Sequence, residues 1–248
     1  MMLHQYLDST YLKTASQDGI TAQEHLKKNT FFINEAIRER FKLIMLLPEM
    51  VTHAKSLINK AQSDVLVGTV IDFPLGNATT NEKLHQAQKA LDYGADELDF
   101  VIDYKAFIQG NISKVKDELI TCTQLVIDNG KTAKWIIETA ALDNEQIQHL
   151  CTLIKETILS HFPNQDTYSD VFVKSSTGFY PTPTNVPNGA TSENIKLMLQ
   201  YAHPLPVKAS GGVRNRQQAL ELIALGVKRI GTSSAKEIVD GKDTLGTY

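Results

Sequence analysis

Eight short apolar runs alternate with stretches of helical period along the 248-residue chain. The strand-like runs cover residues 5–8, 42–46, 65–71, 97–102, 133–138, 170–174, 206–209 and 229–232. Strands that alternate with helices form βαβ units, and such units build a parallel sheet. Eight units in this length average about 31 residues each, the size of one unit in a (β/α)8 barrel. We therefore predict an α/β fold, a (β/α)8 TIM barrel that occupies residues 1–248 as a single domain. A doubly wound open sheet is the alternative.

The stretches between the runs carry the start and stop signals of helices. Asp143 precedes an apolar stripe and has Gln146 three residues after it, which is the pattern of a capping box. Another stripe, with Leu222 and Ile223, ends at Gly226, and glycine adopts the left-handed conformation of a helix end at low cost. No charge run or Pro/Gly/Ser-rich linker divides the chain, which favours one domain.

Charge and hydropathy exclude two classes of partner. The formal net charge of −3 gives no basic surface for nucleic acid, so no nucleic-acid partner is expected. No apolar run reaches the roughly 20 residues that span a bilayer. The first eight residues also lack the basic and apolar regions of a signal peptide. We therefore expect no membrane partner.

The cysteines and histidines form no metal or redox motif. Cys122 and Cys151 are the only two cysteines, and both lie in helix-like patterns, which argues against a disulfide scaffold and indicates a reducing cytoplasm. The seven histidines are scattered, without His-x-His or His-Glu-x-x-His spacing. We expect no dedicated metal site.

Two lysines stand at the ends of consecutive strand-like runs. Lys174 ends residues 170–174, Lys208 lies in residues 206–209, and small residues follow each lysine. They are about one strand–helix–strand unit apart, so we expect them on neighbouring strands about 4.8 Å apart. Burial and a neighbouring cation both lower the pKa of a lysine, and a neutral lysine is the nucleophile of Schiff-base catalysis. The alternative is that both ammonium groups simply extend into solvent.

An acidic residue, Asp99, lies in the middle of the apolar run 97–102. An unpaired carboxylate would be expensive there. A barrel places this fourth strand across the interior from the sixth and seventh, so we expect Asp99 to pair with a lysine and to help move protons. The alternative is a structural acid that caps a loop amide.

Glycine-rich segments follow the seventh and eighth runs. Residues 210–214 read Ser-Gly-Gly-Val-Arg, and residues 231–234 read Gly-Thr-Ser-Ser. Glycines let backbone N–H groups approach an anion closely. The loops after strands seven and eight are also the frequent phosphate site of (β/α)8 barrels. The two segments together predict a phosphate site.

Taken together, these motifs resemble the 2-deoxyribose-5-phosphate aldolase family. The two lysine segments and the Asp99 segment, in this order, carry the resemblance, which extends over nearly the whole chain. The similar segments are residues 7–13, 68–76, 97–102, 136–139, 172–178, 207–214 and 231–234.

The resemblance implies a TIM barrel and a class I aldolase that uses no cofactor. It implies reversible cleavage of 2-deoxy-D-ribose 5-phosphate to D-glyceraldehyde 3-phosphate and acetaldehyde, in deoxyribonucleotide and deoxynucleoside catabolism. Matched position by position, Lys174 is the Schiff-base lysine, Lys208 the lysine that lowers its pKa, and Asp99 the acid of the proton relay. The positions that match the substrate and phosphate site are Thr177, Gly178, Gly211, Gly212, Gly231, Ser233 and Ser234.

Three further positions bear on the resemblance. Some members of the family end in a tyrosine that relays a proton, and Tyr248 ends this chain; an incidental chain end is the alternative. Met45 stands where the family often carries a cysteine, and Phe179 stands where some relatives carry a lysine near the phosphate. The consequences of these two departures stay open.

Two other functions remain open at this point. One is another Schiff-base phosphosugar aldolase, such as a transaldolase-like enzyme, and the other is a phosphosugar-binding barrel without turnover. The expected partner is a small-molecule phosphosugar, and the expected compartment is the cytoplasm. The sequence does not give the oligomeric state, for which a homodimer is a working hypothesis.

Overall fold

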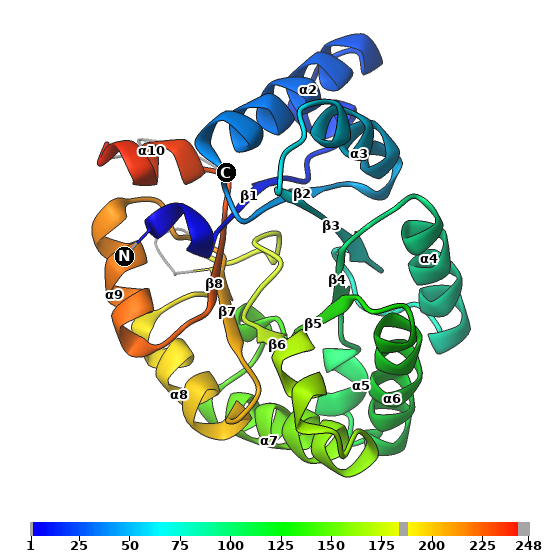
Figure 1. The fold of residues 1–248 in the computed structure, drawn as a ribbon. Coiled ribbons are helices and arrows are strands. Elements are labelled where there is room, and N and C mark those ends of the chain that lie inside the picture. Colours follow the sequence, from blue (N-terminus) through cyan, green and yellow to red (C-terminus); the bar gives the residue numbers. More distant parts are fainter. Residues whose placement is uncertain (1, 184–187, 243–248) are drawn as a thin grey trace.

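Eight parallel strands close into a barrel in the computed structural model, which describes residues 2–183 and 188–242 (Figure 1). The strands are β1 (Leu7–Tyr11), β2 (Leu43–Leu46), β3 (Leu66–Ile71), β4 (Glu97–Val101), β5 (Thr132–Ile136), β6 (Val171–Lys174), β7 (Val207–Ser210) and β8 (Arg229–Thr232). Each strand pairs with the next one along the chain, and β8 pairs with β1. The predicted (β/α)8 barrel is confirmed, and the open-sheet alternative is wrong.

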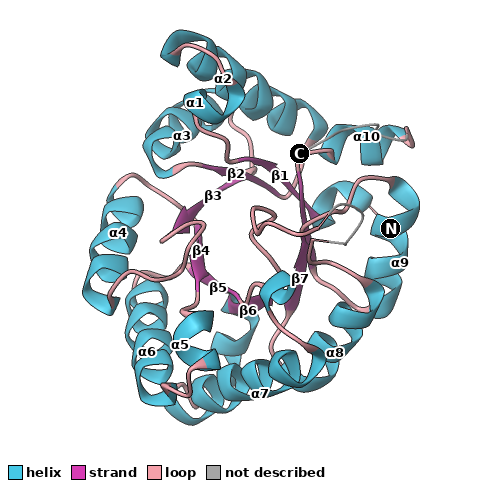
Figure 2. Ribbon diagram, turned by 180° about the vertical axis from the view of Figure 1, so that it is seen from behind, coloured by secondary structure: helices cyan, strands magenta, loops and turns pink. Residues whose placement is uncertain are grey.

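Helices surround the barrel as an outer ring (Figure 2). They are α1 (Ala15–Asp18), α2 (Ala22–Glu39), α3 (Val51–Lys60), α4 (Thr80–Asp92), α5 (Tyr104–Ile108), α6 (Ile112–Asp128), α7 (Asn144–His161), α8 (Ser192–Ala202), α9 (Arg216–Leu225) and α10 (Ala235–Asp240). The predicted capping box forms at α7, where the Asp143 side chain accepts from the Gln146 backbone and the Gln146 side chain accepts from the Asp143 backbone. Gly226 ends α9 in the left-handed conformation, as predicted.

The first strand begins later than the apolar pattern indicates. The run at residues 5–8 predicted a strand there, but Leu3–Tyr6 is a 3-10 turn and β1 covers Leu7–Tyr11. In the hydropathy pattern, the polar residues that follow Leu7 indicate the end of a strand. They belong to the strand because Asp8 points into a charged barrel interior, where it meets buried cations from β7 and β8. Its backbone is in register with Leu43 of β2 and Gly231 of β8.

The main core lies between the strands and the helices. Phe100 of β4 and Trp135 of β5 point outward and stack with ring centroids 4.9 Å apart. The Trp135 indole N–H donates to the Thr123 hydroxyl of α6 at 3.0 Å, so its one polar atom is satisfied. Burial of a large apolar side chain contributes about 1.5–3 kcal/mol, and this layer fixes each helix against its strands.

The interior of the barrel is apolar on the side of β2 and β3. Met45 is fully buried there, and a Cβ atom added to Gly68 would lie 2.6 Å from its terminal methyl carbon. Gly68 therefore leaves the space that the methionine fills. Phe179 joins the same side, with its ring edge-on to Phe73 at 5.1 Å between centroids. Both departures from the family pattern are thus packing residues of this apolar side.

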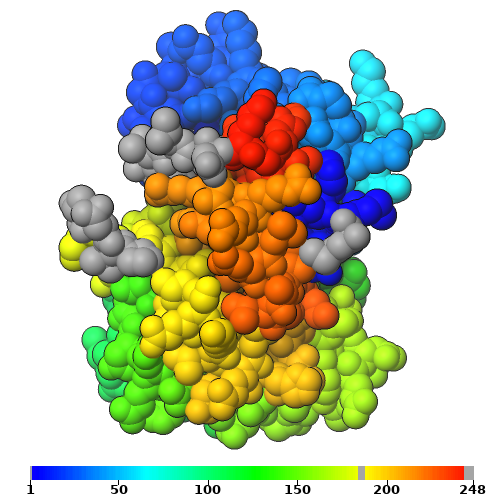
Figure 3. Space-filling model, turned by 90° about the vertical axis from the view of Figure 1, so that its left-hand side faces the viewer, coloured from blue at the N-terminus to red at the C-terminus, as the bar shows by residue number. Residues whose placement is uncertain are grey.

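The helix ring closes where the last helix meets the first part of the chain. Figure 3 shows α10 (red) between α9 (orange) and the N-terminal segments (blue). None of the helices in the described residues is long and apolar enough to cross a membrane. The remaining side of the barrel interior, from β4 round to β8 and β1, is charged.

Candidate active site

A cavity of about 910 Å³ opens at the carboxyl ends of the strands on the charged side. Lys174 reaches it from the end of β6, and Thr10 and Leu12 border it near the end of β1. Every residue predicted for the substrate and phosphate site also lines it: Thr177, Gly178, Gly211, Gly212, Gly231, Ser233 and Ser234. The fold therefore gathers loops from β6, β7 and β8 around one cavity.

Lys174 and Lys208 meet Asp99 at the bottom of this cavity. The two lysines are in register on β6 and β7. The Nζ of Lys174 lies 2.8 Å from Oδ2 of Asp99, and the Nζ of Lys208 lies 2.9 Å from the same oxygen. Lys174 is 4% exposed and lines the cavity, whereas Lys208 and Asp99 are fully enclosed beneath it. The structure brings the three predicted residues into one cluster and leaves only Lys174 within reach of a ligand.

Further buried charges close a circuit with this cluster. Lys134 of β5 lies 2.7 Å from Oδ1 of Asp99 and 2.6 Å from Glu97, which in turn pairs with Arg229 at 2.5 Å. Arg229 lies 3.0 Å from Asp8, and Asp8 lies 2.6 Å from Lys208, which returns to Asp99. The members of this closed set, hereafter the charge ring, are Asp8, Glu97, Asp99, Lys134, Lys208 and Arg229.

The charge ring sets the electrostatics of Lys174. It holds three carboxylates and three cations, so it is neutral by itself, and Lys174 is a surplus buried cation attached to it. Burial lowers the pKa of Lys174 to about 8, with Asp99 opposing the shift and Lys208 adding to it. Burial alone would raise the pKa of Asp99, but Lys134, Lys174 and Lys208 hold it well below its usual range. A fraction of Lys174 is therefore neutral and nucleophilic near physiological pH.

The glycine loops pack against one another as well as facing the cavity. A Cβ atom on Gly211, whose φ is +92°, would lie 2.0 Å from the Asn188 carbonyl oxygen, so only glycine fits there. A Cβ atom on Gly231 would lie 3.1 Å from the Lys208 side chain, so this glycine makes room for the buried lysine. The Thr232 hydroxyl accepts from the Ser234 backbone at 3.0 Å and donates to the Val213 carbonyl at 2.7 Å, which ties the two loops together.

The sequence reasoning missed four members of the charge ring: Asp8, Glu97, Lys134 and Arg229. Lys134 carries a usable signal, because it stands between Ala133 and Trp135 in an apolar run, as Asp99 does in its own. The reasoning that singled out Asp99 applies to it unchanged. Asp8 and Arg229 lie at the edges of their runs and gave no such signal. Tyr248 lies outside the described residues.

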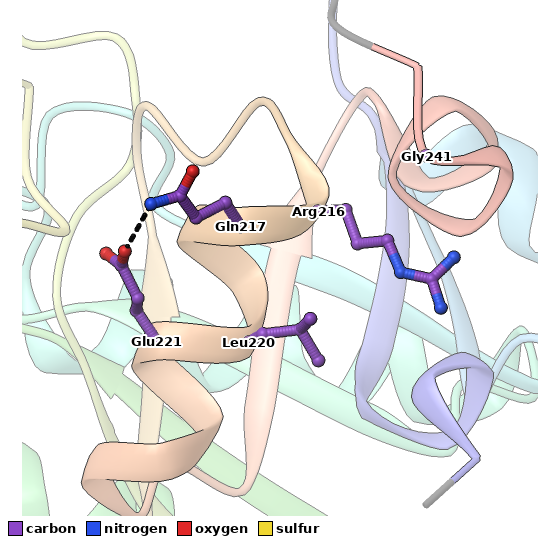
Figure 4. Close-up of a pocket in the computed structure, with 5 residues that line it drawn as sticks. All are labelled: Arg216, Gln217, Leu220, Glu221 and Gly241. Atoms are coloured by element: carbon purple, nitrogen blue, oxygen red, sulfur yellow. Dashed lines mark hydrogen bonds between the residues drawn. The ribbon is translucent and has the colours of Figure 1, made fainter.

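A second hollow lies on the outer surface between α9 and α10 (Figure 4). Gln217 donates to Glu221 of the same helix at 2.9 Å, and Arg216 donates to the Val239 carbonyl of α10 at 3.1 Å. The polar side chains of this hollow therefore hold α9 and α10 in place. None of the predicted site residues borders it. Among the described residues, no group of three or more His, Cys, Asp or Glu side chains is placed to hold a metal ion.

Curated proteins and solved structures resemble the whole chain. Deoxyribose-phosphate aldolase of Thermococcus gammatolerans is 37% identical over 242 residues, 97% of this chain and 96% of that protein. The Staphylococcus epidermidis protein of the same name is 37% identical over 243 residues, 98% of this chain and 97% of its own length. A deoxyribose phosphate aldolase from Aeropyrum pernix, described as tetrameric, superposes with a TM-score of 0.76 at 28% identity, covering 96% of this chain and 89% of that chain. No protein-family model matches the chain.

Proposed function

Since the chain belongs to the deoxyribose-phosphate aldolase family, and is a lyase of that kind, we propose that it works as a class I aldolase through a Schiff base on Lys174. The substrate is 2-deoxy-D-ribose 5-phosphate, and the products are D-glyceraldehyde 3-phosphate and acetaldehyde. The physiological setting is deoxyribonucleotide and deoxynucleoside catabolism.

One observation carries the proposal: Lys174 is a buried amine with a pKa of about 8 that borders the cavity at the carboxyl ends of the strands. Lys208 supports the amine rather than competing with it, because Asp8 and Asp99 hold its ammonium group beneath the cavity. A neutral amine beside a carboxylate matches the requirement for imine formation, which needs a nucleophile and a proton donor or acceptor.

The proposed reaction passes through an imine and then an enamine on Lys174. The neutral Lys174 amine adds to C1 of the open-chain sugar, and the carbinolamine takes up a proton from the acid–base groups at the site and loses water to give a protonated imine. Loss of the C3 hydroxyl proton breaks the C2–C3 bond, whose electrons form an enamine with the imine nitrogen as electron sink. D-Glyceraldehyde 3-phosphate leaves, the enamine carbon gains a proton, and hydrolysis releases acetaldehyde. The loops with Gly211, Gly212 and Ser234 bind the phosphate, so remote binding energy positions the reacting bond.

Borohydride trapping tests the proposal. Reduction in the presence of deoxyribose 5-phosphate is expected to leave a stable adduct on Lys174, found by peptide mapping, and Lys174→Ala is expected to abolish it. An adduct on Lys208 would reverse the assignment of the two lysines. A phosphosugar-binding barrel without turnover would bind the substrate but form no adduct, and a transaldolase-like enzyme would release no acetaldehyde.

Tyr248 stays a prediction that rests on the family resemblance. A phenol at the imine would relay the proton to or from the enamine carbon. Tyr248→Phe is then expected to lower kcat and to slow exchange of the acetaldehyde methyl hydrogens with solvent, while the adduct on Lys174 survives. Unchanged exchange would make Tyr248 an ordinary chain end.

We further propose a cytoplasmic homodimer. Two free cysteines, both buried, agree with a reducing compartment. The relative from Aeropyrum pernix is described as tetrameric, so light scattering on the purified protein decides between two and four subunits.

A further inference from the structure

A buried carboxyl group outside the charge ring lies beside the lysine segment. Glu138 follows β5 and is 1% exposed, in a left-handed conformation with a φ of +55°. Its neighbours continue the pairing of β5 with β6, because Ile137 N donates to the Lys174 carbonyl at 3.0 Å and Thr139 N donates to the Ser175 carbonyl at 2.9 Å. The backbone that carries Lys174 therefore fixes Glu138 from both sides.

The Glu138 carboxylate is bound to Thr177, a residue of the cavity wall. Its Oε2 accepts from the Thr177 hydroxyl at 2.5 Å and from the Thr177 backbone N–H at 3.3 Å. Thr177 borders the cavity together with Lys174 and Gly178. Thr177 thus lies between a buried carboxylate and the cavity.

Glu138 differs from the other carboxylates near the barrel interior. Asp8, Glu97 and Asp99 each form salt bridges with lysine or arginine. Among the described residues, no salt bridge involves Glu138. Burial raises the pKa of Glu138, while hydrogen bonds to Thr177 and Ser176 and the charge of Lys174 oppose this shift. Burial raises the pKa of Tyr104 of α5, and the nearby Glu138 charge adds to this rise.

Two carboxyl groups with opposite pKa shifts at one site indicate two different proton-transfer roles. Three lysine contacts occupy both oxygens of Asp99, so its carboxylate serves the amine and imine nitrogen of Lys174. Cleavage of the sugar also requires an acceptor for the hydroxyl proton on C3, two carbons from the imine carbon. Glu138 is a better match for that acceptor, because it forms no salt bridge among the described residues and its burial outweighs the opposing charge of Lys174.

We propose that Glu138 acts through Thr177 as the acceptor of the C3 hydroxyl proton during carbon–carbon cleavage, an assignment that rests on the proposed function. Thr177 touches the substrate, and Glu138 is the positioning residue behind it. The C3 hydroxyl proton passes to Oγ1 of Thr177 as the Thr177 hydroxyl proton passes to Oε2 of Glu138. The C3 oxygen forms the new carbonyl, the C2–C3 bond breaks, and its electrons form the enamine on Lys174. Glu138 then returns its proton to solvent through the same hydroxyl after the aldehyde leaves.

The proposal separates two reactions that one active site performs. Exchange of the acetaldehyde methyl hydrogens in D2O requires the imine and enamine but no C3 hydroxyl group. Cleavage of deoxyribose 5-phosphate requires the imine and enamine and also the removal of the C3 hydroxyl proton. We expect Glu138→Gln to slow cleavage by roughly 10²–10⁴, the usual range for lost acid–base catalysis. Acetaldehyde exchange and borohydride trapping on Lys174 should stay within about twofold of the unchanged protein.

Thr177 supplies the matched pair of variants. Thr177→Val removes the hydroxyl at nearly constant size and is expected to reproduce the loss in cleavage but not in exchange, while Thr177→Ser keeps the hydroxyl and is expected to restore cleavage. This pair tests the relay even where Glu138→Gln does not fold. Equal losses in exchange and cleavage would mean that Glu138 only supports the loop, and unchanged cleavage in Glu138→Gln and Thr177→Val would overturn the proposal. Failure of the unchanged protein to form any borohydride adduct would instead overturn the proposed function itself.

Discussion

Lys174 differs from the other interior lysines in how its charge is balanced. Lys134 and Lys208 each pair with two carboxylates of the charge ring. Among the described residues, Lys174 pairs with one, through an Asp99 oxygen that Lys208 already shares. Burial raises the cost of a cation that is only partly compensated. In the proposed mechanism, Lys174 is therefore set apart as the nucleophile by its place in the ion-pair network, because Lys134 and Lys208 are of the same residue type.

Substitutions of its two charged neighbours should move the pH dependence of Lys174 in opposite directions. Lys208→Met removes a cation, so the pKa of Lys174 rises and the acid limb of the kcat/KM profile moves to higher pH. Asp99→Asn removes an anion, so the pKa of Lys174 falls and this limb moves to lower pH, while turnover drops by roughly 10²–10⁴. A charge at this distance typically shifts a pKa by about 1–3 units.

Pre-steady-state adduct formation at several pH values measures both shifts directly. Circular dichroism of each variant serves as the control for folding. Shifts of the same sign in the two variants would contradict the electrostatic account, and activity of Asp99→Asn within about twofold of the unchanged protein would make the carboxylate structural.

Single residues were predictable from the sequence where a charge interrupts an apolar run. Asp99 has this signal, and the two lysines were marked instead by the small residues that follow each of them; the structure places all three together. Arg229 and Glu97 do not have it, because they lie at the ends of their runs, and their pairing across the interior joins residues 132 positions apart. Glu138 was equally hidden, since its burial depends on a loop from the next strand. Which charge meets which across a barrel depends on register and closure, and neither is encoded locally.

At the scale of elements, the loops after β7 and β8 should separate phosphorylated from unphosphorylated substrates. Ser234 borders the cavity, and its backbone is not in the left-handed region, so a larger side chain is tolerated there. Ser234→Glu places a carboxylate against the expected phosphate, and like charges about 4 Å apart cost about 4 kcal/mol at a partly screened site. We expect kcat/KM for deoxyribose 5-phosphate to fall roughly 10²–10³-fold.

Unphosphorylated deoxyribose should lose little in the same variant, because it carries no anion at that end. Ser234→Gln, which has the same size without the charge, is the matched control and should lose far less with the phosphorylated sugar. Equal losses on both sugars in Ser234→Glu would show that this loop only supports the fold.

The helix layer should protect both thiols from alkylation. Cys122 lies in α6 and Cys151 in α7; both are fully buried, and burial raises the pKa of each to about 12. The thiolate is the reactive form, and Met45 occupies the barrel interior where the family often has a cysteine. Treatment with iodoacetamide is therefore expected to leave activity within about twofold of the untreated enzyme. Mass spectrometry should find both cysteines modified only after denaturation; rapid labelling with inactivation in the native state would contradict this.

The order of the elements was predictable, because hydrophobic period and turn residues are local signals. The boundaries of β1 were not predictable. A strand of a (β/α)8 barrel that lines a charged interior exposes polar side chains to other strands rather than to solvent. Asp8 is fully buried for this reason. A hydropathy pattern treats such a residue as the end of a strand, and only the partners on β7 and β8 show that the strand continues.

At the scale of the molecule, the charge ring links β1, β4, β5, β7 and β8 across the interior. The apolar side packs Met45 against its neighbours, so the two sides of the barrel are held by different interactions. Replacement of a complete buried ion pair by apolar residues is often neutral, whereas removal of one partner is costly because the other charge stays buried and uncompensated. The ring therefore makes the barrel sensitive to single substitutions.

Arg229→Met tests this sensitivity on a residue that does not line the cavity. It leaves Asp8 and Glu97 with one cation each, and we expect the free energy of unfolding in urea to fall by about 3–5 kcal/mol near neutral pH. The pKa of Glu97 is lowered in the folded protein because Lys134 and Arg229 together outweigh its burial. The stabilising effect of Glu97 is thus complete above its unfolded pKa and is lost as pH falls through the folded pKa. The difference in the free energy of unfolding between the variant and the unchanged protein should therefore narrow in acid.

Glu97→Gln added to Arg229→Met should recover part of the loss, while Lys236→Met, at a surface pair with Asp240, should change stability little. A loss that is independent of pH, or no loss at all, would show that the buried charges do not hold the barrel together.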